Sequence, residues 1–158
     1  MTRYEFFNVT RAICQIDQPK DCGFIIFTQL PEFTEIEFYL KNLPPGLHGC
    51  HIHKTGDRRN GCTSMGPHFN PLNGTHKDVN EVGNHLGDLG NILVDKNGQC
   101  NTKMYVQYLP LTGPHQIIGR GLIIHERQDD LGRTNHPDSK TTGNSGGRIA
   151  CGIIAFLD

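Results

Sequence analysis

Short segments in which apolar and polar residues alternate recur along the chain and predict β-strands. In 34–41 and 101–108, every second residue is apolar over most of the segment, as in a strand with one face on a core. Turn-forming Gly, Pro, Asn and Asp separate the segments, as in 42–46 and 95–98. No segment shows a helical period with caps. Strands are predicted at about 11–17, 22–30, 34–41, 47–53, 91–96, 101–108, 116–125 and 149–157.

Eight short strands joined by turns predict an all-β fold, an eight-stranded Greek-key β-sandwich or flattened barrel. Two gaps, about 54–90 and 126–147, are too long for hairpins. They are polar but not of low complexity, so we interpret both as ordered functional loops built around a site. A chain of 158 residues predicts a single domain over 1–158, with 1–10 as an N-terminal extension.

Composition narrows the class of protein. Hydrophobic residues make up 35% of the chain, and no run is long enough to span a membrane. The N-terminus does not resemble a signal peptide, so we expect a cytoplasmic protein without membrane contact. A formal charge of -1 offers no broad basic face for nucleic acid. The six cysteines form no CxxC pair, which disfavours a zinc ribbon, and reduced thiols are the expectation in the cytosol.

Nine histidines point to a metal site, because imidazole is the commonest metal ligand. His51 and His53 share one face of a predicted strand, whereas His48 has the opposite parity and is interpreted as structural. Any single histidine could be an ordinary core or surface residue, but seven candidates in two sequence clusters favour copper or zinc. The spacing does not tell how many ions bind or which residue binds which ion. The seven candidate ligands are His51, His53, His68, His76, His85, Asp88 and His125.

Several longer motifs resemble those of copper/zinc superoxide dismutases. Their order and mutual spacing match that family from about residue 11 to the C-terminus, and the family is a β-sandwich. The motifs are 46–53 (GLHGCHIH), 61–71 (GCTSMGPHFNP), 85–91 (HLGDLGN), 117–120, 125–126 with 129–132, and 142–152.

The resemblance implies an enzyme of antioxidant defence that converts superoxide to dioxygen and hydrogen peroxide by cycling copper between Cu(II) and Cu(I). It implies copper and zinc as cofactors, with His68 bridging the two ions and taking part in catalysis. The implied copper ligands are His51, His53, His68 and His125. The implied zinc ligands are His68, His76, His85 and Asp88.

Further roles follow only from the resemblance. Arg148 would be the catalytic arginine beside copper, although from sequence alone a surface salt bridge is an equal alternative. Asp129 would hydrogen-bond one ligand of each metal, where a solvated loop acid is the ordinary alternative. Cys62 and Cys151 would form a disulfide. The other four cysteines, Cys14, Cys22, Cys50 and Cys100, are expected to remain thiols.

The resemblance also bears on partners. It implies a homodimer and a possible copper chaperone, but Thr55 stands where many members have a dimer-contact Phe, so that contact would differ. Residues 136–144 look more like insect, plant or large-DNA-virus versions, which would place a viral protein in the host cytoplasm or virion. Lys140 is a candidate guiding charge for an anionic substrate, with a solvated loop lysine as the commoner alternative.

Two other functions compete with the enzyme. A non-catalytic copper- and zinc-binding relative could act as a metal buffer or decoy, but such a relative would be expected to lose a ligand, Asp129 or Arg148. A small zinc-stabilised interaction domain would not need His51, His53 and His125 together. The presence of all these residues favours the enzyme.

Overall fold

The structure is a computed structural model that describes residues 10–157. Residues 1–9 of the predicted N-terminal extension therefore lie outside the described part. Within that part the strands are β1 (Arg11–Gln15), β2 (Gly23–Gln29), β3 (Thr34–Leu40), β4 (Gly46–His53), β5 (Arg59–Cys62), β6 (Asp88–Val94), β7 (Cys100–Val106), β8 (Gly121–His125) and β9 (Arg148–Leu157). A 3-10 turn, η1 (Thr63–Met65), and one helical turn, α1 (Ser139–Thr142), complete the elements.

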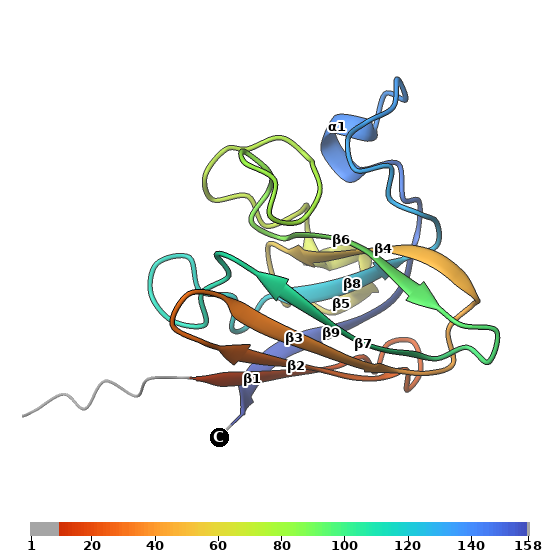
Figure 1. Cartoon of the computed structure of the whole chain (residues 1–158). Helices are drawn as coiled ribbons and strands as arrows, with labels where there is room; N and C mark the ends of the chain where they lie inside the picture. Colours follow the sequence, from red (N-terminus) through yellow and green to blue (C-terminus); the bar gives the residue numbers. More distant parts are fainter. Residues whose placement is uncertain (1–9, 158) are drawn as a thin grey trace, which may run out of the picture.

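Eight strands form one antiparallel sheet in the order β6-β4-β8-β9-β1-β2-β3-β7, which curls into a nearly closed barrel (Figure 1). The long strand β9 pairs with β8 along its first half and with β1 along its second half, so it connects the two layers. Consecutive strands β3 and β4 are not neighbours, because β4 crosses to lie between β6 and β8 while β7 returns to pair with β3. This is the predicted Greek-key all-β architecture.

The core lies between the two layers and is filled by alternate residues of the strands. Ile25 faces Phe38 and Phe27 faces Ile36 across β2 and β3, and all four side chains are fully buried. Such cross-strand apolar pairs are the unit that stabilises a sheet. Four thiols remain unpaired and buried within the described part, as predicted: Cys14, Cys22, Cys50 and Cys100.

The alternation pattern locates all eight sheet strands but misses the small elements of the long gaps. Strand β8 begins at Gly121, later than the predicted start at 116, because Gly119 has a φ of 83° and breaks the extended backbone. The expectation of no helix is wrong for α1, which has four residues and is too short to show a helical period. Strand β5 and η1 also lie in the first gap.

The two long gaps become two loops beside the β4–β8 layer. The first loop covers residues 54–87 and includes β5 and η1, and the second loop covers 126–147 and includes α1. Figure 1 shows both loops projecting from the side of the barrel that carries β4, β6 and β8. Among residues 10–157, no helix has the length and apolar character needed to cross a membrane.

Candidate metal centre

Strand β4 sets the position of the site. His51 and His53 point to the same side of β4, and β8 lies beside them and ends at His125. A β-bulge between Ile124 and His125 interrupts the pairing with β9 at that end. The first loop returns to β4 through an isolated bridge between His53 and His68, which brings the His68 ring to the same side.

The four-imidazole group consists of His51, His53, His68 and His125. Each residue offers one ring nitrogen, and these four donor atoms lie within 4.8 Å of one another. The donor atoms are Nδ1 of His51 and Nε2 of the other three histidines. All four atoms are buried and have no hydrogen-bond partner among the described residues. Because buried polar atoms are almost always paired, four converging unpaired nitrogens fit a shared metal ion. An all-imidazole donor set suits copper.

The opposite ring nitrogens are held by the protein. His53 Nδ1 donates to the Gly66 carbonyl at 2.7 Å, and His125 Nδ1 donates to the Gly146 carbonyl at 3.0 Å. His51 Nε2 donates to Asp129 Oδ2 at 2.6 Å. These bonds fix the tautomer and orientation of each ring, so that the unpaired nitrogen faces the centre of the group.

The Asp88 group consists of His68, His76, His85 and Asp88. Asp88 Oδ1 lies 3.0 Å from His68 Nδ1, 2.9 Å from His76 Nδ1 and 3.2 Å from His85 Nδ1. By distance alone, a set of four residues whose donor atoms lie within 4.8 Å of one another consists of His51, His68, His76 and Asp88, so it contains His51 in place of His85. We assign His85 here because its Nδ1 faces the same oxygen, whereas the His51 nitrogens face Asp129 and the four-imidazole group. Three imidazoles and one carboxylate suit tetrahedral zinc.

Two residues join the groups. His68 contributes Nε2 to the four-imidazole group and Nδ1 to the Asp88 group. Asp129 is fully buried, and its two oxygens accept hydrogen bonds from His51 Nε2 at 2.6 Å and His76 Nε2 at 2.7 Å. One carboxylate therefore fixes one imidazole of each group.

The pKa values of the titratable side chains differ between the two groups. Burial lowers the pKa of His51 and His53 well below the usual value, and it lowers that of His125 to about 4. These rings are neutral at pH 7, the form that binds metal. For His76, burial alone would lower the pKa, but hydrogen bonds to Asp129 and Asp88 raise it to about 9. Burial would raise the pKa of Asp88, but three imidazole hydrogen bonds lower it far more.

A cavity of about 450 Å³ leads to the four-imidazole group. His53, His68 and His125 line it together with Arg148. The Arg148 guanidinium donates to the backbone carbonyls of Cys62 at 2.9 Å, Thr63 at 3.3 Å and Gly66 at 2.8 Å. This cavity is where a small anion could meet both a fixed positive charge and the imidazoles.

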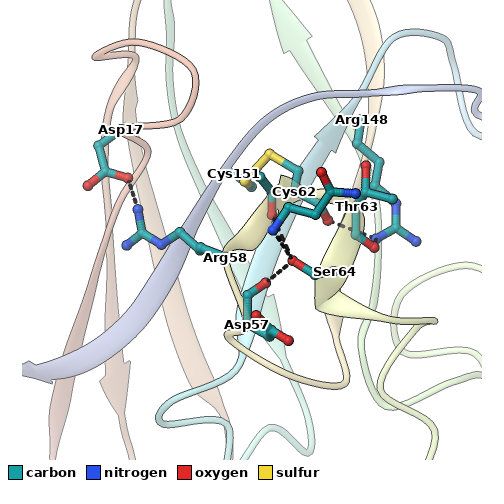
Figure 2. Close-up of a disulfide and its surroundings, with 10 residues drawn as sticks. Asp17, Asp57, Arg58, Cys62, Thr63, Ser64, Arg148 and Cys151 are labelled. Carbon is teal, nitrogen blue, oxygen red and sulfur yellow. Dashed lines mark hydrogen bonds and ion pairs between the residues drawn. A yellow bond between two sulfur atoms is a disulfide. The ribbon is translucent and has the colours of Figure 1, made fainter.

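A disulfide joins Cys62 at the end of β5 to Cys151 in β9 (Figure 2). Its closeness to Arg148 matters, because the Cys62 carbonyl is one of the three groups that hold the guanidinium. In this region Ser64 accepts the Asn60 N–H and donates to the Asp57 carbonyl at 2.8 Å, which orders the turn. The disulfide therefore ties the first loop to the strand that carries Arg148.

The positions of several other predicted residues are also clear. His48 is structural, as its parity indicates: its Nδ1 and Nε2 lie 2.8 and 2.7 Å from the carbonyls of His125 and Pro44. Lys140 is not among the residues lining the cavity, and its ammonium donates to the Gly132 carbonyl at 2.6 Å. Arg127 lines the cavity instead and was missed by sequence analysis. Its spacing of two residues from His125 is the signal that could have found it.

Comparisons with known proteins agree with this geometry. Residues 22–154 match the family model described as copper/zinc superoxide dismutase. The chain is 55% identical over 149 residues to a protein of Autographa californica nuclear polyhedrosis virus provisionally named a Cu-Zn superoxide dismutase, covering 92% of this chain and 98% of that protein. It is 46% identical over 148 residues to the extracellular Cu-Zn superoxide dismutase of Brugia pahangi, covering 92% and 74%.

A solved structure is similar over the whole fold. The crystal structure of the clock protein EA4 has a TM-score of 0.93 and 41% sequence identity, and the match covers 99% of this chain and 100% of that chain.

Proposed function

Because this chain belongs to the copper/zinc superoxide dismutase family, we propose that the four-imidazole group binds copper and the Asp88 group binds zinc. The protein is a superoxide dismutase, an oxidoreductase with copper and zinc as cofactors that converts two superoxide ions and two protons into dioxygen and hydrogen peroxide. The observation that supports this assignment is the set of four unpaired, converging ring nitrogens at the end of an open cavity.

Bound copper would supply the one-electron redox chemistry, and bound zinc, which has no redox chemistry, would supply charge and order. The chain's own residues provide the rest. Arg148 attracts and orients the anion, because its guanidinium carries a permanent charge and borders the cavity. His68 Nε2 belongs to the four-imidazole group beside the cavity, where it can hold a proton and pass it to the peroxide product. We therefore assign catalytic roles to Arg148 and His68.

The non-catalytic alternatives fit the site less well. A metal buffer or decoy would have no use for a cavity that leads to the metal ligands past a held guanidinium. A zinc-stabilised interaction domain would need only the Asp88 group. No observation on the described residues favours either function over the enzyme.

Metal content and superoxide consumption test the assignment together. We expect the purified protein to bind one copper and one zinc per chain and to consume superoxide. His51→Ala should lose copper and activity while keeping zinc, because the Asp88 group remains whole. His115→Ala, which changes a half-buried imidazole outside both groups, should behave like the wild type. Full activity in the His51 variant would contradict the copper assignment.

The oligomeric state, location and domain extent are further proposals. We propose one domain over 1–158 that forms a homodimer through a face containing Ile118, Gly119, Ile153 and Ala155. Ile118 and Ile153 are half-buried and Ala155 is exposed, which leaves apolar surface for a partner. Thr55 would alter one part of the contact. We also propose a cytoplasmic location, which would be the host cytoplasm or the virion if the source is viral. A copper chaperone is a further proposed partner. One relative is extracellular, so an extracellular location is the alternative.

A further inference from the structure

Asn91 in β6 holds the backbone of Asp129 in the second loop. Its Nδ2 donates to the Asp129 carbonyl at 3.0 Å, and its Oδ1 accepts the Asp129 N–H at 2.7 Å. The two residues are 38 positions apart in the chain. One side-chain amide therefore bonds both backbone groups of a single distant residue, which fixes that residue against the edge of the sheet.

The Asp129 side chain is confined as well. Its Oδ1 accepts the Leu131 N–H at 2.7 Å in addition to the bond from His76. Gly143 packs directly against it: a Cβ at Gly143 would overlap Asp129 Oδ1 and come within 2.5 Å of His76 Nε2. Gly143 also has a φ of 70°, which favours glycine. The carboxylate thus has a single position, and that position depends on the backbone that Asn91 holds.

We propose that Asn91 is a positioning residue for both metal groups, acting through Asp129. By fixing the Asp129 backbone, it keeps the carboxylate on the Nε2–H of His51 and of His76. The opposite ring nitrogens of these two histidines then stay aimed at their own groups, so that one amide on a strand orients one ligand of each metal. This role rests on the proposed assignment of the two groups to copper and zinc.

A control residue of the same kind exists in the chain. Asn80 Nδ2 donates to the Tyr105 carbonyl at 2.8 Å, and its Oδ1 accepts the Gln107 N–H at 2.8 Å. These two hydrogen bonds also join a long loop to the end of a strand, but they do not involve Asp129. Asn80→Ala removes the same two kinds of hydrogen bond as Asn91→Ala. Asn80 also has a φ of 62°, which alanine disfavours, so Asn80→Ala disturbs its loop at least as much. A merely structural role of a side-chain amide would therefore show in the Asn80 variant as well.

The test uses the ¹⁵N-labelled holoenzyme with Cu(I) and zinc. We expect Asn91→Ala to speed solvent exchange of the imidazole Nε2–H signals of His51 and His76 at least about tenfold, and to raise the zinc dissociation constant about tenfold, the low end for residues that orient ligands. Asn80→Ala should leave both signals and the zinc dissociation constant unchanged. The zinc constant is measured by competition with a chromophoric chelator.

Asn91→Asp is a second variant in case the alanine variant folds poorly. It keeps the size and the acceptor but places a carboxylate oxygen against the Asp129 carbonyl, so we expect the same direction of change. Protected Nε2–H signals and an unchanged zinc constant in both Asn91 variants would overturn the positioning role. Absence of metal from the wild-type protein would instead count against the proposed function, which keeps the two failures distinct.

Discussion

Three imidazoles of the four-imidazole group use one ring nitrogen within the protein and present the other to a common centre, whereas His68 offers one nitrogen to each metal group. For His53 and His125 the internal partner is a backbone carbonyl, and for His51 it is the Asp129 carboxylate. A carbonyl can only accept, so the bonded nitrogen carries the proton and the opposite one offers a lone pair. The protein therefore sets the metal-binding tautomer before any ion arrives.

At this scale Arg148 gives a prediction about rate. Arg148→Ala should lower the rate constant for superoxide consumption about tenfold or more at low ionic strength, because it removes the charge that draws the anion into the cavity. The remaining rate should also depend less on salt. Pulse radiolysis over a range of ionic strengths measures both effects. Arg59→Ala removes an exposed guanidinium that does not line the cavity and serves as the control. Equal rates in the two variants would contradict the role of Arg148.

His76 gives a prediction about pH for the metal-free protein. Its pKa is about 9 in the fold against 6.5 for a free histidine, so the stability it contributes is complete below pH 6.5 and is lost as the pH rises through 9. We expect the unfolding temperature of the metal-free protein to fall over this interval. His125 acts with the opposite sign between about pH 4 and 6.5, because its pKa is lowered.

Calorimetry at several pH values checks this, with His76→Gln as the variant that should lose most of the slope between pH 6.5 and 9. Substitution of His115, which is half-buried and lies outside both metal groups, by Gln provides the comparison. A stability of the wild-type protein that rises from pH 7 to 9 would show that the sign is wrong.

The sequence predicts the strand-borne part of the site better than the loop-borne part. A period of two residues places His51 and His53 on one side of β4 and separates His48 from them, and the structure confirms both. The second loop has no period, so its sequence does not show that Arg127 lines the cavity while Lys140 does not. The hydrogen bonds of the Asn91 side chain to the Asp129 backbone join positions 38 apart, so no local pattern in the sequence indicates them.

At the scale of elements, the alternation of apolar residues locates the sheet strands because burial on one face repeats with the pleat. It misses β5 and α1, whose residues are exposed or half-buried in most positions, with Ser139 as the buried exception. Both elements are maintained by loop contacts. In α1, for example, the Lys140 carbonyl accepts the N–H of His76 in the first loop at 3.0 Å. Such contacts depend on tertiary structure and leave no periodic pattern.

The disulfide yields a prediction at this scale, because it ties the end of β5 to β9. Replacing both Cys62 and Cys151 by Ser should lower stability by about 4–5 kcal/mol in the chain-entropy model, given their sequence separation of 89. It should also loosen Arg148, whose guanidinium is held by the Cys62 carbonyl. Denaturant unfolding with and without a reductant measures the change.

The wild-type protein should become less stable when it is reduced, whereas the double variant should not respond to the reductant. An equal response of both proteins would mean that the reductant does not act through the Cys62–Cys151 bond.

At the scale of the whole molecule, the metal groups exist only when the barrel is closed. Their residues come from β4, the first loop, the start of β6 and the end of β8, and Arg148 comes from the start of β9. The strand order places β4, β8 and β9 side by side, which brings positions nearly 100 residues apart into one cavity. Metal binding is therefore coupled to folding of the entire domain.

The assembly of two chains provides the prediction for this scale. Light scattering on the purified protein should give twice the 17.6 kDa of one chain. Ile153→Asp should produce monomers, because it places a charge in the apolar face proposed for the dimer. Leu93→Asp changes an exposed leucine on the distant strand β6 and should remain dimeric. A wild-type protein with the mass of one chain would contradict the proposed dimer.

The position of Lys140 away from the cavity wall has a consequence for the working range of the enzyme. Its ammonium donates to the Gly132 carbonyl, and the basic residues that line the cavity are Arg148 and Arg127, the latter ion-paired with Glu126 at 3.1 Å. An ammonium group discharges near pH 10.4, whereas a guanidinium stays protonated well beyond that. An entrance lined by arginine keeps its attraction for a radical anion in alkaline surroundings where one lined by lysine would go neutral.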